Sequence, residues 1–153
     1  MRTLELKIPP PVVALLTAGA MWCVSLAAHM TFMPERFRMF AGIAIALAGI
    51  ATAISGVIAF RRAKTTVNPL RPETSSSLVT SGIYRFTRNP MYVGLTLVLL
   101  GWAVYLAPVW TLLGPLVFAL YMTRFQILPE ERVLIGLFGA TYSEYQAKVR
   151  RWI

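Results

Sequence analysis

A short polar string at the mouth of an apolar segment is the part of this sequence best suited to binding chemistry. The string reads Arg88-Asn89-Pro90-Met91-Tyr92-Val93-Gly94. Pro90 suits the first turn of a helix, where unpaired N–H groups attract anions. The guanidinium of Arg88 can hold a carboxylate or phosphate through two parallel hydrogen bonds, and Gly94 lets a ligand or another backbone come close. The string predicts an anion-binding site, although a plain membrane anchor with an interfacial tyrosine would have the same sequence.

Two adjacent acids, Glu130 and Glu131, are the second candidate, about 40 residues farther along. They are two of only six acids in the chain. Acids in the first turn of a helix are ordinary partners of the helix dipole. They also suit the hydroxyls of a ribose or a cationic group. A ligand with a carboxylate at one end and a positive centre near the other would match Arg88 and the acid pair together, and S-adenosylmethionine is such a ligand.

Composition predicts the class of elements that position these residues. The 153 residues are 57% apolar and only 14% charged, which is too apolar for a soluble domain of this size and indicates a membrane protein. The formal net charge is +9. We assign that charge to basic residues that flank membrane spans and meet anionic headgroups, rather than to nucleic-acid binding.

Two uncharged runs in the first half are each long enough for one membrane crossing of about 20 residues. They are Pro11–Met30 and Met39–Phe60. Small residues at the second run predict close approach of another helix. These small residues are Ala41, Gly42, Ala44, Ala46, Ala48, Gly49, Ala51, Ala53, Ser55 and Gly56.

A third uncharged region, Asn89–Thr123, is too long for one straight crossing. As a single helix it would be about 50 Å long, whereas the hydrocarbon core is about 30 Å thick. The chain should fold back at Pro108, because the residue before a proline, Ala107, is pushed off helical geometry. Tyr105 and Trp110 would anchor this bend at the interface. Two short spans result, Met91–Ala107 and Val109–Phe125.

Basic residues predict the orientation of these spans. In a four-span arrangement, thirteen of the fifteen Lys and Arg residues lie on one side, and only Arg36 and Arg38 lie on the other. The positive-inside rule then places both termini, Arg88 and the acid pair in the cytoplasm. We expect an integral membrane protein, of a prokaryotic inner membrane, whose candidate site faces the cytoplasm.

The predicted tail is amphipathic. Pro129 and the two acids suit the start of a helix, and Gly139 can end it. The apolar side of that helix would carry Val133, Leu134, Leu137 and Phe138. Such a tail could lie on the bilayer surface or cover a pocket opened by the central loop.

The predicted fold is all-α, a polytopic membrane protein with about four transmembrane helices and a cytoplasmic amphipathic C-terminal helical tail. The third and fourth helices form the tight hairpin. The chain, 1–153, would form a single membrane domain. Its parts are two N-terminal spans (1–60), a cytoplasmic loop (61–90), the helical hairpin (91–127) and a tail that completes the cofactor pocket (128–153). The oligomeric state stays open, although the small residues of the second span would permit pairing.

The single cysteine and the single histidine do not suggest a metal centre, and no metal site is predicted. Cys23 leaves no partner for an internal disulfide and excludes a cysteine-based metal site. We interpret it as a small buried hydrophobe. His29 follows in the same apolar stretch, and we interpret it as a packing or interfacial residue rather than a ligand.

The second half of the sequence resembles a known family. The segments Gly82-Ile83-Tyr84-x-x-x-Arg88-Asn89-Pro90-x-Tyr92-x-Gly94 and Glu130-Glu131-x-x-Leu134-x-x-x-Phe138-Gly139-x-x-Tyr142-x-x-Tyr145-x-x-x-Val149 resemble the isoprenylcysteine carboxyl methyltransferases. Phospholipid N-methyltransferases are similar too. The shared signature is Arg-His-Pro-x-Tyr-x-Gly followed by a distal Glu-Glu. The resemblance covers Gly82–Ile153.

The resemblance implies an integral membrane enzyme that methylates a lipophilic acceptor with S-adenosylmethionine. The acceptor would enter from the bilayer, and the donor would sit under the tail. The implied cofactor-binding residues are Tyr84, Arg88, Asn89, Pro90, Tyr92, Gly94, Glu130 and Glu131. Arg88 and Glu131 are the implied catalytic residues.

Two departures from the family pattern bear on the acceptor. Asn89 stands where the family usually has His, and an amide cannot titrate near neutral pH. Leu137 stands where some relatives have a basic residue that would anchor an acceptor carboxylate. The acceptor stays open among a prenylated peptide, a phospholipid amine and a small lipophilic acid or thiol. The alternative functions are a membrane reductase that uses NADPH in a similar C-terminal pocket, and a non-enzymatic scaffold that binds anionic lipid.

Overall fold

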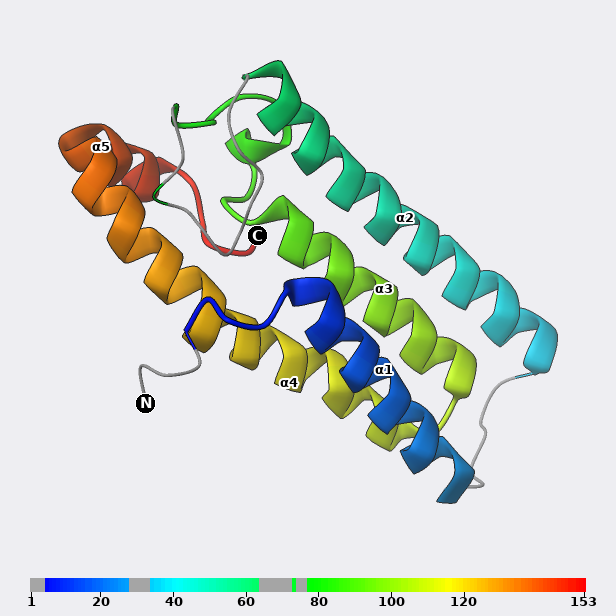
Figure 1. The fold of residues 1–153 in the computed structure, drawn as a ribbon. Helices are drawn as coiled ribbons and strands as arrows, with labels where there is room; N and C mark the ends of the chain where they lie inside the picture. Colours follow the sequence, from blue (N-terminus) through cyan, green and yellow to red (C-terminus); the bar gives the residue numbers. More distant parts are fainter. Residues whose placement is uncertain (1–4, 28–33, 64–72, 74–76) are drawn as a thin grey trace.

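The computed structural model of the protein describes residues 5–27, 34–63, 73 and 77–153, and the regular structure of these residues is helical. His29 lies outside them. Four helices, α1, α2, α3 and α4, run side by side, and α5 continues from the end of α4 (Figure 1). Their bounds are Pro10–Ala27, Glu35–Arg62, Pro90–Leu106, Leu113–Met122 and Leu128–Lys148. The prediction of an all-α fold is confirmed.

Length and surface character agree with a membrane protein. Three stretches are long and apolar enough to cross a membrane: Pro10–Ala27, Glu35–Arg62 and Val109–Lys148. The helix α3 is apolar but has only 17 residues, in line with the short third span that the sequence predicts. Large apolar side chains point away from the bundle on α1, α2 and α4, among them Leu15, Leu47 and Leu116. The count of four spans stays a prediction.

Glycines join α2 to α3 at very short distance. Gly42, Gly49 and Gly56 repeat every seven residues on α2, so they share one face, which packs along α3. A Cβ atom added to Gly49 would lie 2.6 Å from the carbonyl oxygen of Gly94, and one on Gly42 would lie 2.8 Å from that of Gly101. The small-residue face therefore allows close helix packing, as predicted, and its partner is α3 of the same chain.

The hairpin bends at the predicted position. Ala107 has a φ of 82°, outside helical geometry, and Pro108 follows it. The hydroxyl of Thr111 lies 2.6 Å from the Pro108 carbonyl oxygen and 3.2 Å from that of Ala103, so one buried side chain ties the two arms of the bend together. A short 3-10 helix, η4 (Val109–Leu112), then leads into α4.

The junction between α4 and α5 is a π-helical turn, η5 (Thr123–Ile127). Pro129 has no N–H to donate to the carbonyl four residues earlier, which belongs to Phe125. The backbone N–H of Leu6 donates to that carbonyl instead, at 3.0 Å. The buried side-chain amide of Gln126 in turn donates to the carbonyl of Ile8 at 2.8 Å. The N-terminal segment thus fastens the turn that precedes Glu130 and Glu131.

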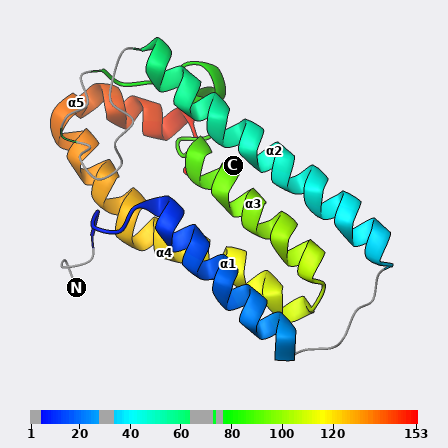
Figure 2. The ribbon, with the colours of Figure 1, turned by 45° about the vertical axis from the view of Figure 1, so that its right-hand side comes forward.

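The tail helix α5 kinks at Gly139, whose φ of 51° and ψ of −125° break the helix at the residue predicted to end it. Beyond the kink the chain runs back toward the start of α3, and the C-terminus lies close to that start in both views (Figures 1 and 2). Tyr142 and Tyr145 are buried in the returning segment. The tail therefore covers the end of the bundle that carries Arg88.

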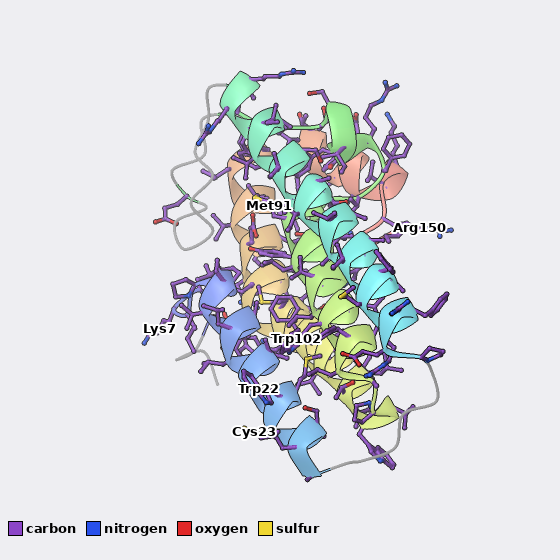
Figure 3. All side chains as sticks on the ribbon, turned by 90° about the vertical axis from the view of Figure 1, so that its right-hand side faces the viewer. Lys7, Trp22, Cys23, Met91, Trp102 and Arg150 are labelled. Atoms are coloured by element: carbon purple, nitrogen blue, oxygen red, sulfur yellow. The ribbon has the colours of Figure 1, made fainter. Side chains whose placement is uncertain are left out.

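Packing of α1 on α3 corrects one prediction. Trp22 meets Trp102 edge to face, with ring centroids 6.4 Å apart, and the indole N–H of Trp102 donates to the carbonyl of Ala18 at 3.1 Å. Cys23, the next residue along α1, is exposed rather than buried (Figure 3). A helix at the edge of a bundle turns part of its apolar surface outward, and apolar character alone does not reveal which part.

Candidate active site

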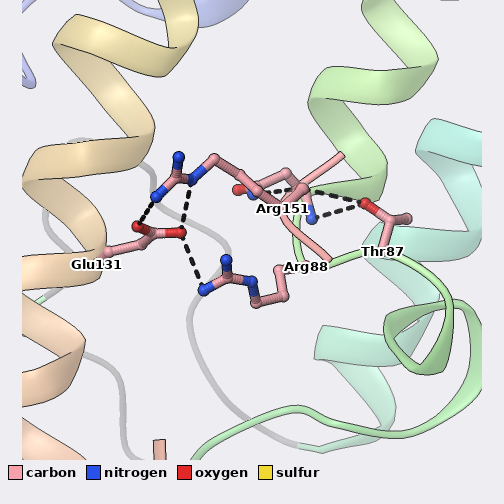
Figure 4. Close-up of polar contacts among 5 residues, drawn as sticks. Thr87, Arg88, Glu131 and Arg151 are labelled. Atoms are coloured by element: carbon pink, nitrogen blue, oxygen red, sulfur yellow. Dashed lines mark hydrogen bonds and ion pairs between the residues drawn. The ribbon is translucent and has the colours of Figure 1, made fainter. Parts of the chain in front are cut away.

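The C-terminal segment crosses the start of α3, and hydrogen bonds to its backbone carbonyls hold it there. The backbone N–H of Arg88 donates to the carbonyl of Arg150 at 3.0 Å. The side-chain amide of Asn89 donates to the carbonyl of Arg151 at 2.9 Å, and the Thr87 hydroxyl donates to the same carbonyl at 3.3 Å (Figure 4). The polar string predicted to bind a ligand thus also holds the end of the chain.

Arg88 and Glu131, the two residues that the sequence predicts as partners in one site, are in direct contact. The Nη1 atom of Arg88 lies 3.1 Å from Oε1 of Glu131, and the two side chains are only 10% and 8% exposed. The sequence predicted that they would meet opposite ends of one ligand. In the structure the two side chains lie at the same site but form an ion pair with each other directly.

A second guanidinium, that of Arg151, holds the same carboxylate. Its Nε donates to Oε1 of Glu131 at 3.0 Å and its Nη2 donates to Oε2 at 2.8 Å. Figure 4 shows the guanidinium groups of Arg88 and Arg151 both pointing toward Glu131. The hydrogen bond to Glu131 raises the pKa of Arg151, because it stabilises the charged form. Two positive groups therefore share one negative group at this end of the bundle.

Arg88 still has unused hydrogen-bonding capacity. Its Nη1 is close to Glu131, yet the N–H is not aligned for a hydrogen bond, and its buried Nε has no hydrogen-bond partner among the described residues. Buried guanidinium N–H groups usually have an acceptor, because leaving one unpaired costs about 1 to 3 kcal/mol. Arg88 therefore carries a buried donor that its described neighbours leave without an acceptor.

Glu130 faces a different partner from Glu131. The hydroxyl of Tyr92, a buried residue in the first turn of α3, donates to Oε2 of Glu130 at 3.3 Å. Within the described ranges no ion pair is formed by Glu130. The two acids that are adjacent in sequence thus differ in the structure: one is neutralised by arginine, and the other meets a tyrosine hydroxyl.

Tyr84 supports the site from the loop that precedes α3. It lies in a short 3-10 helix, η3 (Gly82–Arg85), and its ring packs edge to face on Phe60 at 5.3 Å. Its carbonyl accepts a hydrogen bond of 2.7 Å from the hydroxyl of Tyr145. Burial raises the pKa of Tyr84, so its phenol stays protonated. These contacts tie the loop to α2 on one side and to the tail on the other.

Two other predicted residues lie on the α2 side of the site. Pro90 is buried at the start of α3, and a Cβ atom added to Gly56 would lie 3.2 Å from its ring. Gly94 meets Gly49, so its contact is with the backbone of α2. Both residues set how closely α2 approaches the start of α3.

A cavity of about 210 Å³ lies at the other end of α2. Its lining residues are Glu35, Arg38, Tyr105 and Leu106. The predicted site residues are absent from that lining, and Arg38 there donates to the carbonyl of Tyr105 at 3.1 Å. We therefore place the candidate site at the start of α3 and not at this cavity.

Comparison with known proteins identifies the family of this chain. The model of the phospholipid methyltransferase family matches residues 37–141, which include most of α2, all of α3 and the acid pair. This chain belongs to that family. The matched range includes Arg88 and the two acids, and it ends just before the C-terminal segment that carries Arg151.

Three relatives extend this finding. The protein-S-isoprenylcysteine O-methyltransferase of Schizosaccharomyces pombe is 37% identical over 75 residues, 47% of this chain and 30% of the relative. A probable protein-S-isoprenylcysteine O-methyltransferase of Oryza sativa is 31% identical over 116 residues, 74% of this chain and 59% of the relative. An uncharacterized protein of Haemophilus influenzae is 43% identical over 63 residues, 41% of this chain and its own full length. The chain thus spans less than two thirds of either methyltransferase relative.

Sequence reasoning missed Arg151 as a member of the candidate site. We interpreted the basic residues of the tail as orientation charges, and nothing in their spacing separates Arg151 from Lys148 and Arg150. Thr87 was missed as well, although it precedes the predicted string directly. A Thr two residues before an Asn, both able to hold a backbone carbonyl, was the one local signal available.

Proposed function

We propose that the protein is an integral membrane methyltransferase that transfers a methyl group from S-adenosylmethionine to a lipophilic acceptor. The observation that supports this most is the buried meeting of Arg88 and Glu131 at the start of α3, beneath the returning tail. The positive-inside pattern supports a cytoplasmic position for this end of the bundle. We further propose that the membrane is a prokaryotic inner membrane.

Arg88 would bind the carboxylate of the donor. Its buried Nε has no hydrogen-bond partner among the described residues, so a carboxylate oxygen placed there would satisfy an otherwise costly N–H group. The start of α3 adds unpaired backbone N–H groups and the positive end of the helix dipole. Asn89 and Tyr92 would orient the donor, and Pro90 would fix the start of the helix that presents them.

The acid pair would bind the other parts of the donor. Glu131 suits the ribose hydroxyls, because a carboxylate has two oxygens that accept parallel hydrogen bonds. Glu130 lies beside the Tyr92 hydroxyl without a cationic partner of its own among the described residues, and it would face the positive centre of the donor. Tyr84 and Gly94 would not touch the donor. They would support the site through the contacts that hold the loop and α2 in place.

In methyl transfer the donor and the acceptor react directly with each other, so the protein forms no covalent bond to either. The donor supplies an electrophilic methyl group on a sulfonium, and the acceptor atom displaces the sulfur in line. The chain would hold the two reactants in that line and keep water away, and its buried arginine and acid pair provide fixed binding points for one of them. A carboxylate or thiolate acceptor needs no base, whereas a protonated amine must first lose a proton.

The acceptor is proposed only as a lipophilic molecule that reaches the site from the bilayer. The names of the relatives point to an isoprenylcysteine carboxylate, and the name of the family points to a phospholipid. Asn89 lacks the titratable ring of the family's usual His, and the exposed Leu137 lacks the positive charge that would anchor an acceptor carboxylate, so both classes of acceptor stay in the test.

Two experiments test this function. The detergent-solubilised protein should bind S-adenosylmethionine and S-adenosylhomocysteine in calorimetry, and NADPH should not bind. Incubation with a methyl-labelled donor and total host lipid should then produce a labelled lipid or lipid-linked peptide. Binding of NADPH alone would replace this proposal by a reductase, and binding of none of the three ligands would favour a non-enzymatic scaffold.

A further inference from the structure

The two guanidinium groups at Glu131 differ in how they are held. Arg88 is 10% exposed, whereas Arg151 is 35% exposed and reaches the carboxylate from the solvent side. Only Arg151 makes aligned hydrogen bonds, one to each oxygen of Glu131. The accessible arginine therefore uses both oxygens, and the buried arginine provides a nearby positive charge.

The backbone of Arg151 is held by contacts that do not involve its partly exposed side chain. Its carbonyl accepts hydrogen bonds from Thr87 and Asn89, and the indole N–H of Trp152 donates to the hydroxyl of Thr123 at 3.1 Å. These contacts belong to the backbone and to the next residue, so none depends on where the Arg151 guanidinium points. The side chain can leave Glu131 without release of the C-terminal segment.

We propose that Arg151 competes with the ribose diol of the methyl donor for Glu131. This inference rests on the proposed function. A guanidinium edge presents two parallel N–H donors to a carboxylate, and a cis-diol can present two O–H donors to the same two oxygens. The oxygens of Glu131 that Arg151 uses are the ones a diol needs. The two partners therefore exclude each other, and the donor has to displace the arginine.

The exchange leaves no buried charge unpaired. When Arg151 swings out to water, Arg88 stays 3.1 Å from Glu131 and continues to balance it. Loss of a sole partner would strand a carboxylate in an apolar setting, at a cost of several kcal/mol. Because Arg88 remains beside Glu131, this cost does not arise. The carboxylate can therefore exchange Arg151 for the ribose diol as its hydrogen-bonding partner.

Competition of this kind sets how tightly nucleoside ligands bind. The observed dissociation constant equals the intrinsic constant divided by the fraction of molecules in which Glu131 is free. If Arg151 holds Glu131 in about 70 to 90% of molecules, binding is weakened about threefold to tenfold. The effect falls on the ribose end of the ligand and is independent of the carboxylate end, which Arg88 binds.

The test compares two ligands on matched variants of the full chain in detergent. S-adenosylhomocysteine carries the diol and the amino-acid carboxylate, and 5′-methylthioadenosine carries the diol alone. Arg151→Ala should tighten both ligands about threefold to tenfold. Lys148→Ala, which removes an exposed positive charge from the same tail, should leave both dissociation constants unchanged.

Each remaining result overturns part of the account. Unchanged or weaker binding by Arg151→Ala refutes the competition, and tightening of S-adenosylhomocysteine alone refutes the assignment to the diol. If Arg151→Ala does not fold, Arg151→Lys serves instead, because an ammonium cannot form the parallel fork and should also tighten both ligands. A wild-type protein that binds neither ligand contradicts the proposed function as well, and wild-type binding that position 151 does not affect contradicts only this inference.

Discussion

The body of α3 and its N-terminal start are held in place by different kinds of contact. Along its body, α3 meets α2 through glycines, and a Cβ atom on Gly94 would lie 2.5 Å from the carbonyl oxygen of Gly49. At its start, the same helix gathers charged groups from the loop, from α5 and from the chain end. Steric fit thus fixes the first region and charge balance the second. The glycine face of the helix body leaves no room for added atoms, whereas the start of the helix is the place where we propose an exchange of hydrogen-bonding partners.

The largest effect is expected in the helix body. Gly49→Val places a side chain where a single Cβ atom would already lie 2.6 Å from the Gly94 carbonyl oxygen. We expect a loss of about 3 kcal/mol or more in the free energy of unfolding, because overpacking forces α2 and α3 apart. Thermal unfolding in detergent measures it. Gly19→Val in α1 is the control, since a Cβ there meets nothing within 4 Å, and equal melting temperatures for the two variants would refute steric control.

The next largest loss of stability is expected from removing the negative charge at the start of α3. Glu131→Gln keeps the shape of the side chain but leaves Arg88 and Arg151 without their shared counter-charge. We expect a loss of about 2 kcal/mol, smaller than for a fully buried pair because Arg151 is partly exposed. Denaturant unfolding measures it, with the exposed Glu144→Gln of the same helix as control. A variant as stable as the control would mean that the carboxylate does not balance this end of the bundle.

The smallest effect is expected where the loop joins the tail. Tyr145→Phe removes the hydroxyl that donates to the carbonyl of Tyr84 at 2.7 Å. An unsatisfied buried carbonyl costs about 1 to 2 kcal/mol. The melting temperature should fall by more than it does for Ser143→Ala, which removes an exposed hydroxyl from the same segment. If the two variants melt together, the tail does not stabilise the loop through this bond.

Features that depend on neighbouring residues were predictable from the sequence. The small residues of the second span predicted close packing, Pro108 predicted the bend at Ala107, and Gly139 predicted the break in the tail helix. Each follows from a local steric property: the absence of a side chain, a ring that blocks helical geometry in the preceding residue, or freedom at positive φ. The sequence also predicted, from topology and from the family resemblance, that Arg88 and Glu131 belong to one site, but with a ligand between them rather than in direct contact.

Features that depend on the return of distant segments were not predictable. The hydrogen bond from Leu6 to Phe125 needs the N-terminal segment to cross a turn more than a hundred residues away in sequence. Arg151 reaches Glu131 only because the kink at Gly139 sends the chain back over α3. The outward position of Cys23 depends on which helices flank α1. In each case the composition was known, and the missing information was which segments lie side by side.

The most direct test of the central claim is the affinity of Arg88→Ala for S-adenosylhomocysteine, measured by calorimetry beside the wild-type protein. Arg85→Ala, an exposed arginine three residues earlier, is the matched control. If Arg88 holds the carboxylate of the donor, its removal should weaken binding by at least about a hundredfold, the loss expected for a buried charge-assisted pair, while Arg85→Ala binds like wild type. An Arg88→Ala protein that is folded and binds with unchanged affinity would contradict the account.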